Sequence, residues 1–184
     1  ATATPTGLEK QLLEKYKDDL PEALFTEAFQ LDNGNVDGNL RSQMRQALGL
    51  FKQAGYTVKD QKMVDSNNNP FEFELLLRSA TMERVALPFK ENLQKIGVTM
   101  NIRLLSDSAQ YINRLRDRKF DMVSTTVGGG VYPSDSLRLQ WHSDYLDSTY
   151  NVVGTTDPLI DFLIDGIVDN QNNDEQLMAF GKAL

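Results

Sequence analysis

The residue types that could carry chemistry in this chain gather in one stretch, between residues 125 and 150. It contains three successive glycines at 128–130, followed by aromatic, acidic, basic and imidazole side chains. The glycines do not form a nucleotide site, because the GKS or GKT ending of a phosphate loop is absent and the dinucleotide GxGxxG motif is incomplete. They let the backbone approach a ligand or another segment closely, and a flexible turn fits them equally well. Long connections of this kind tend to be functional in compact domains.

Catalytic and metal-binding sites find little support in the sequence. His142 is the only histidine and there is no cysteine, so a zinc site lacks its usual ligands. A serine nucleophile would need a G-x-S-x-G elbow, which is absent, and no pattern pairs two carboxylates as acid and base. The alternating Asp and Asn of residues 31–38 resemble a calcium loop, but Gln43 stands where an EF-hand has glutamate. We therefore predict a plain loop there, and no catalytic residue, metal site or cofactor.

The elements that must position the polar stretch centre on a helix–strand–helix–strand unit over residues 82–122. A helical pattern that contains Pro88 leads into a predicted strand at 98–105, after which Ser106 and Asp107 begin a second helix. A second strand is predicted at 120–125, shortly before the glycines. Because two strands joined by a helical crossover normally lie parallel, the unit predicts an α/β layered domain. It also places the carboxyl end of the second strand beside the polar stretch, where open α/β sheets bind ligands.

The remaining segments predict helices and one hairpin. Asn39 and Gly55 bracket an amphipathic helical pattern, and Asp157 with Pro158 is a strong helix start. Two strand-like runs at 56–64 and 71–77 are separated by the turn-forming residues 65–70, so a β-hairpin is predicted. Further expectations are a helix at 8–17, extended backbone at 23–31, a break at 170–173 and a final helix capped by Asp174.

Composition bounds the class of protein. The 184 residues, 40% hydrophobic and 24% charged, suffice for one domain with a real core and are short for two complete ones. A formal net charge of -7 and a sequence pI of about 4.7 give a nucleic-acid role no electrostatic support. The lack of cysteine suits the periplasm as well as the cytoplasm, and no apolar run is long enough to span a bilayer. The first residues lack the features of a signal peptide and the last ones stop inside a helical pattern, so we expect a piece of a longer protein.

Five ordered groups of residues carry a resemblance to a known family. They are an Ala-Gly-Tyr helix end at 44–56, a strand at 73–77, an Ile-Gly-Val junction at 88–98, a Tyr…Phe-Asp segment at 111–122 and an Asn…Asp-Pro segment at 151–161. From about residue 40 to its end, the chain resembles the C-terminal lobe of the extracellular solute-binding proteins of family 5, the oligopeptide and dipeptide ABC-transporter class. Residues 21–29 and 129–137 look most like the YejA-like subgroup. Each motif is weak alone, whereas the ordered series is fairly specific.

The resemblance implies an α/β fold with a mixed β-sheet flanked by helices, one lobe of a periplasmic-binding-protein type II-like fold. It divides the chain into an N-terminal helix and linker, residues 1–38, and a truncated solute-binding lobe, residues 39–184. It also implies a periplasmic receptor that closes on an oligopeptide or peptide-like solute, catalyses no reaction and delivers the solute to the membrane permease of an ABC transporter. The N-terminal lobe would lie outside this chain, and no nucleic acid is expected as a partner.

The resemblance and the polar stretch together suggest ligand-binding residues facing a cleft: Tyr132, Asp135, Arg138, Trp141 and Asn151. In many peptide binders of the family, an Asp directly before the loop tyrosine holds the amino terminus of the ligand. Here Val131 precedes Tyr132, and the nearest acid is Asp135. Arg138 would pair with a ligand carboxylate, or equally with an acid of its own chain. Tyr132 and Trp141 fit a hydrophobic core as well as a binding site.

Two other functions stay open. The same lobe fused to a regulatory domain would sense a solute, and a helix-turn-helix domain upstream would favour that function. The other is an unrelated α/β hydrolase or transferase. Loss of turnover on replacing Asp135 or His142 with alanine would favour the enzyme.

Overall fold

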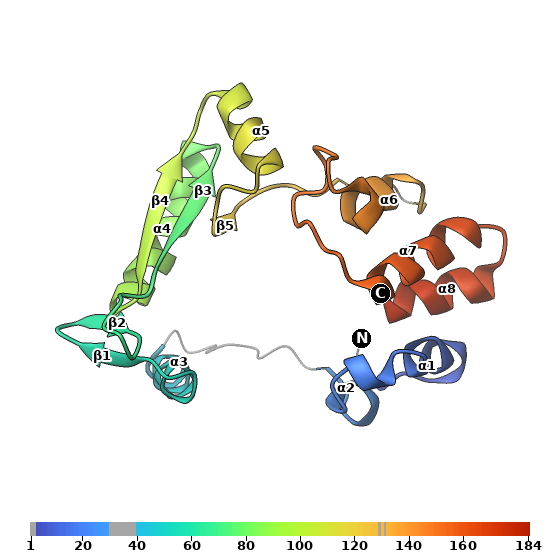
Figure 1. Cartoon of the computed structure of the whole chain (residues 1–184), viewed down its shortest axis with the longest axis horizontal. Coiled ribbons are helices and arrows are strands. Elements are labelled where there is room, and N and C mark those ends of the chain that lie inside the picture. Colours follow the sequence, from blue (N-terminus) through green and yellow to red (C-terminus); the bar gives the residue numbers. More distant parts are fainter. Residues whose placement is uncertain (1–2, 30–39, 129, 131) are drawn as a thin grey trace. The chain divides into compact units, whose positions relative to one another are not determined.

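The computed structural model describes residues 3–29, 40–128, 130 and 132–184 of the chain (Figure 1). Its internal contacts divide the chain into two compact units, one made of Ala1–Leu31 with Val127–Leu184 and the other of Asp32–Thr126. Each unit has a hydrophobic core of its own. The loop expected at 31–38, the helix cap expected at Asn39 and the domain boundary expected between residues 38 and 39 lie outside the described residues.

The unit Asp32–Thr126 is built on a three-stranded parallel sheet in the order β4-β3-β5. Its strands are β3 Glu72–Leu77, β4 Thr99–Leu104 and β5 Met122–Val123 (Figure 1). β3 pairs with β4 over its full length and with β5 at Leu75 and Leu76. The two strands predicted on either side of a helical crossover are therefore parallel, as expected, but β3 lies between them.

Two capped helices connect these strands. α4 Ala80–Gln94 begins where the Ser79 side chain accepts a hydrogen bond from an amide of the first turn, and α5 Ser108–Arg116 begins in the same way at Asp107. α4 contributes Ala86 to a core that also contains Leu75 and Met100 of the sheet. Pro88 lies inside α4, as the sequence indicates. The helices and the parallel strands confirm the predicted α/β class.

A separate antiparallel hairpin precedes the parallel sheet. It consists of β1 Thr57–Lys59 and β2 Lys62–Val64, and its turn is made by Asp60 and Gln61, which both have positive φ. Helix α3 Arg41–Gln53 comes before it and ends as predicted, with Gly55 in the left-handed region at φ 89°.

The hairpin predicted between residues 56–64 and 71–77 is wrong. The first run folds back on itself as β1 and β2, and the second run is β3 of the parallel sheet. One antiparallel bridge remains, from Val64 at the end of the first run to Pro70, the last residue of the turn. The turn between them does form, because Asp65 accepts hydrogen bonds from backbone amides within it. The sequence thus predicted the chain reversal correctly and the pairing partner incorrectly.

The described part of the other unit, Ala1–Leu31 with Val127–Leu184, has helices as its regular structure. They are α1 Gly7–Glu14, α2 Ala23–Thr26, α6 Ser136–Trp141, α7 Pro158–Asp169 and α8 Asp174–Ala183, with 3-10 turns at Lys17–Asp19 and Ser143–Tyr145 (Figure 1). Leu12 and Leu13 of α1 pack with Leu163 of α7 and Phe180 of α8 in one core. The beginning and the end of the chain therefore share this core.

Two local predictions in this unit need correction. Extended backbone was expected at 23–31, but α2 occupies its first four residues, closed by a hydrogen bond from the Glu27 amide to the Ala23 carbonyl. Asp174 was expected to cap the last helix, but the cap is Asn173, whose side chain accepts from the Gln176 amide. Asp157 caps α7 as predicted. None of the helices described is both long and apolar enough to cross a lipid bilayer.

Candidate functional site

A row of polar contacts joins α6 to α7. Arg138 of α6 donates hydrogen bonds from Nε to Asp165 Oδ1 at 2.7 Å and from Nη2 to Asp169 Oδ1 at 2.7 Å. Its Nη1 donates to Asp135 Oδ1 at 3.0 Å. Asp165 and Asp169 are four residues apart and therefore lie on one face of α7. A single guanidinium thus binds two successive turns of α7 and the residue that precedes α6.

The positive charge of Arg138 is paired with these three carboxylates. Hydrogen bonds to Asp169 and Asp165 hold the pKa of Arg138 above its ordinary value, and Asp135 adds to this effect against the opposing effect of desolvation. The Arg138 side chain is 20% exposed, whereas the Asp135 side chain is 82% exposed. Of the two roles considered for Arg138, the structure contains the one in which it pairs with acids of its own chain.

The same face of α7 holds the residues that follow α6. Ser143 donates from its amide and its hydroxyl to the two carboxylate oxygens of Asp161. His142 is buried, and its Nδ1 accepts a hydrogen bond from the amide of Asp144 at 3.1 Å, so the proton of a neutral ring lies on Nε2. That atom is 3.6 Å from Asp165 Oδ2. His142 therefore supports the α6–α7 contact, and no cluster of potential ligands among the described residues is arranged to hold a metal ion.

Four of the five predicted ligand-binding residues lie in the short segment that α7 holds. Tyr132 precedes α6 and donates from its hydroxyl to the Gln171 carbonyl oxygen at 2.6 Å, yet the residue is 55% exposed. Asp135 directly precedes α6 and is also exposed. Trp141 is the last residue of α6 and is partly buried. The structure thus brings Asp135 and Arg138 into contact and bonds Tyr132 to the end of α7, and the side chains of Tyr132 and Asp135 are both exposed.

Asn151, the fifth predicted residue, lies in a different environment. It is 2% exposed, and its Nδ2 donates to the His142 carbonyl oxygen at 3.1 Å. Its Oδ1 accepts from the Gly154 amide at 2.8 Å. Both ends of the amide are therefore bonded to backbone of the same unit. Asn151 braces the loop between α6 and α7, and its contact with a ligand stays a prediction.

Replacing Asn151 with alanine is expected to destabilise this unit by about 1–3 kcal/mol, because the substitution removes both hydrogen bonds from a buried site. Urea unfolding followed by the fluorescence of Trp141, the only tryptophan, would measure the loss. Asn172→Ala is the matched control, since Asn172 is exposed in the same unit and should change stability by less than about 0.5 kcal/mol. Equal unfolding midpoints for the two variants would contradict the bracing role.

The sequence-based predictions did not include the acids of α7 among the functional residues. Asp161, Asp165 and Asp169 recur every four residues, which places them on one side of the helix. Arg138 and His142 show the same spacing of four. Matching the two spacings would have suggested that these segments pack together through charged groups.

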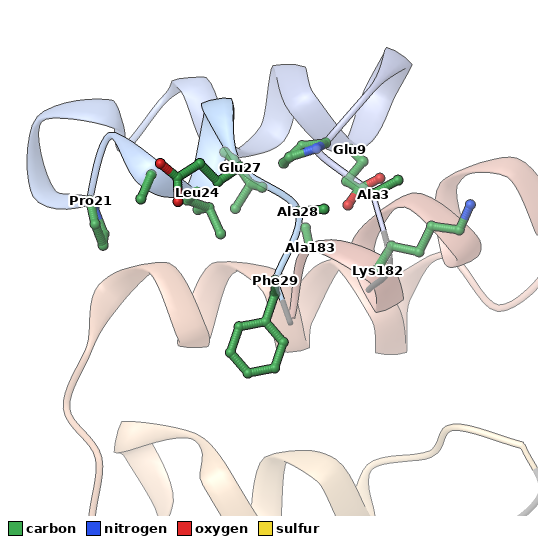
Figure 2. Close-up of a pocket in the computed structure, with 12 residues that line it drawn as sticks. Ala3, Glu9, Pro21, Leu24, Glu27, Ala28, Phe29, Lys182 and Ala183 are labelled. Carbon is green, nitrogen blue, oxygen red and sulfur yellow. The ribbon is translucent and has the colours of Figure 1, made fainter. Parts of the chain in front are cut away.

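A cavity of about 800 Å³ lies elsewhere in the same unit (Figure 2). It is lined by Leu13 of α1, by Leu24 and Phe29 from α2 and beyond, and by Lys182 near the end of α8. Apolar side chains dominate these walls. The charged lining residues are Glu9 and Glu27, which are acidic, and Lys182, which is basic. None of the five predicted ligand-binding residues lines the cavity.

Residues 7–147 match the bacterial extracellular solute-binding proteins, family 5 Middle. Members of this family and the structural neighbours are binding proteins rather than enzymes. The predicted resemblance is thereby confirmed.

Curated relatives and solved structures agree with this family. The uncharacterised protein YejA of Escherichia coli strain K12 is 38% identical over 181 residues, which cover 98% of this chain and 30% of that protein. The probable peptide-binding protein YejA of Agrobacterium fabrum is 31% identical over 182 residues, which cover 97% of this chain and 30% of that protein. The oligopeptide-binding protein AppA of Bacillus subtilis, solved with a nonapeptide, has a TM-score of 0.63 at 14% identity, covering 96% of this chain and 36% of that one.

A second solved structure extends the likeness in fold. It is the mannohexaose-bound periplasmic oligopeptide-binding protein of an ABC transporter from Thermotoga maritima, with a TM-score of 0.60 at 20% identity, covering 97% of this chain and 31% of that one. The predicted fold, part of a periplasmic binding protein, is thus confirmed. The chain spans about 30% of the length of the curated relatives YejA. It belongs to the bacterial extracellular solute-binding proteins, family 5.

Proposed function

We propose that this chain is part of the substrate-binding component of an ABC transporter, which captures oligopeptides or peptide-like solutes for uptake. The observation that carries the proposal is the pair of exposed polar side chains, Tyr132 and Asp135, on a segment that α7 holds in place. A binding surface of this kind needs fixed backbone, a polar group and an aromatic face, and it needs no catalytic pair.

The partners and location follow from the family. Family 5 proteins are extracellular or periplasmic, so we place the protein in the periplasm, where it would deliver solute to a membrane permease. We assign residues 39–184 to its C-terminal lobe and residues 1–38 to the segment leading into it. An N-terminal lobe outside this chain would complete the cleft, in keeping with the share of the relatives that the chain spans.

The names of two similar proteins support a peptide as the solute. The Agrobacterium fabrum relative is described as a probable peptide-binding protein, and the Bacillus subtilis AppA structure contains a nonapeptide. Aromatic side chains and backbone groups recognise peptide backbone without regard to its sequence, which suits a receptor for many peptides.

Calorimetry of the full-length protein with tripeptides to nonapeptides of defined sequence tests the proposal. Tyr132→Ala and Asp135→Asn should each weaken binding by about tenfold, because each removes an exposed group of the proposed contact surface. Tyr150→Ala and Asp18→Asn are matched controls, since both residues are exposed in the same unit but outside the segment held by α7. The absence of peptide binding by the wild-type protein, or equal losses in test and control variants, would refute the proposal.

A further inference from the structure

We infer that Arg138 is a positioning residue of the ligand-binding segment, and that it acts through α7 rather than by contact with the solute. This inference rests on the proposed function, because it assumes that the segment from Tyr132 to Trp141 faces the ligand. It assigns to Arg138 the task of fixing α6, and with it Tyr132 and Asp135, along one face of α7 before the solute arrives.

Two residues of the segment, and Ser143 shortly after it, bind α7 and its end. Ser143 binds Asp161 near the start of α7, Arg138 binds Asp165 and Asp169 farther along, and Tyr132 binds the Gln171 carbonyl just past its end. The residue numbers rise along α7 as they fall along the segment, so the two run antiparallel. Figure 1 shows α6 beside α7. Arg138 is the middle one of these three residues and the one that reaches two turns of the helix.

The geometry of the contact requires arginine. Its planar guanidinium offers donors in different directions, and here Nε and Nη2 bind Asp165 and Asp169 while Nη1 binds Asp135. A lysine ammonium is a single point of charge and cannot reproduce this fork. Three of the donor groups are thereby engaged by acids of the chain, and the Arg138 side chain is mostly buried. A ligand carboxylate would have to displace one of these partners to bind Arg138.

A short helix needs such an external hold. α6 has only six residues, and an isolated helix of that length is not stable in water. Its hydrogen bonds to α7 therefore help to keep it helical and to fix the direction of Asp135, which Arg138 also binds directly. Fixing a binding loop beforehand raises affinity, because less conformational freedom is lost when the ligand binds.

Two measurements on the full-length protein test this role together. Arg138→Ala should weaken the binding of a defined nonapeptide by about tenfold or more, because the segment is no longer held before the ligand binds. In the absence of peptide, hydrogen exchange of the amides in residues 136–143 should become about tenfold faster. Arg138→Lys should restore both quantities in part, since one charged contact with α7 survives. Arg103→Ala, which removes an arginine–glutamate pair in the other unit, should leave both unchanged.

A double-mutant cycle separates action through α7 from direct contact. The pair Asp165→Asn with Asp169→Asn should weaken peptide binding nearly as much as Arg138→Ala, and adding Arg138→Ala should then have little further effect. Weaker binding with unchanged exchange in Arg138→Ala would mean that Arg138 contacts the solute, which overturns the inference. Faster exchange with unchanged affinity, or no change in either, would overturn it too. A wild-type protein that binds no peptide would instead refute the proposed function, whatever the exchange data show.

Discussion

Gly97→Ala is expected to destabilise the unit Asp32–Thr126 by about 3 kcal/mol, from two additive causes. Gly97 has φ 84°, and an L-residue in the left-handed region costs about 1–2 kcal/mol. In addition, a Cβ at this position would lie 2.7 Å from the backbone nitrogen of Met63 and 3.0 Å from the carbonyl carbon of Lys62. These are backbone atoms of β2, so the contact is relieved only if the hairpin moves.

The displaced atoms hold the hairpin to the residues that follow α4. The Met63 amide donates to the Gly97 carbonyl oxygen at 2.7 Å, and Met63 packs in a core with Ile96 and Val98. Moving the hairpin away from Gly97 therefore strains a hydrogen bond and a buried methionine at the same time. The consequence should be greatest for β1 and β2, which have no other described partner strand apart from the single bridge to Pro70.

Gly55→Ala provides the control for this prediction. Gly55 has a similar φ of 89°, but nothing lies within 4 Å of the position that a Cβ would take. Gly55→Ala should therefore lower the free energy of unfolding only by the cost of an L-residue at positive φ, about 1–2 kcal/mol. Denaturant unfolding followed by far-ultraviolet circular dichroism would give both values, and hydrogen exchange of the Met63 amide would detect movement of the hairpin. Equal destabilisation by the two variants would show that the approach of Gly97 to β2 does not contribute.

Local signals in the sequence predicted most of the elements but not all of their partners. Ser and Asp caps, glycine after a helix and Asp-Pro at a helix start act over a few residues, and the caps at Asp107 and Asp157 and the glycine at Gly55 are found where expected. The strand at 71–77 was assigned to the wrong neighbour because its turn is visible locally. One of its actual partners, β4, begins at Thr99, 27 residues after the Glu72 with which it pairs.

The candidate site follows the same rule. The sequence located Tyr132, Asp135, Arg138 and Trp141 in one stretch because their types are concentrated there. It left two roles open for Arg138, because the deciding partners, Asp165 and Asp169, are 27 and 31 residues away in sequence. Asn151 was grouped with them by its place next to that stretch and by the resemblance, and only the fold shows that its amide is bonded within a buried loop.

Gly166→Ala is expected to destabilise the unit formed by Ala1–Leu31 and Val127–Leu184 by about 2–3 kcal/mol. Gly166 is a buried residue of α7, and a Cβ there would overlap the Phe180 ring of α8. Phe180 packs in the core that joins α1, α7 and α8, and its ring contacts Phe162 at a centroid distance of 5.5 Å. The ring must therefore leave its place or push the helices apart. This loss exceeds the gain of about 0.5–1 kcal/mol that alanine normally brings to a helix.

Gly181→Ala and a second-site change make this prediction specific. Gly181 lies in α8 next to Phe180, with nothing within 4 Å of a Cβ, so Gly181→Ala should stabilise the unit by about 0.5–1 kcal/mol. Phe180→Leu destabilises alone, but it removes the ring atoms Cε1 and Cζ, two of the three atoms nearest to the new methyl group. The double variant Gly166→Ala with Phe180→Leu should then be more stable than the sum of the two single changes predicts. Trp141 fluorescence reports the unfolding of this unit, and strict additivity would show that the methyl group and the ring do not compete for one space.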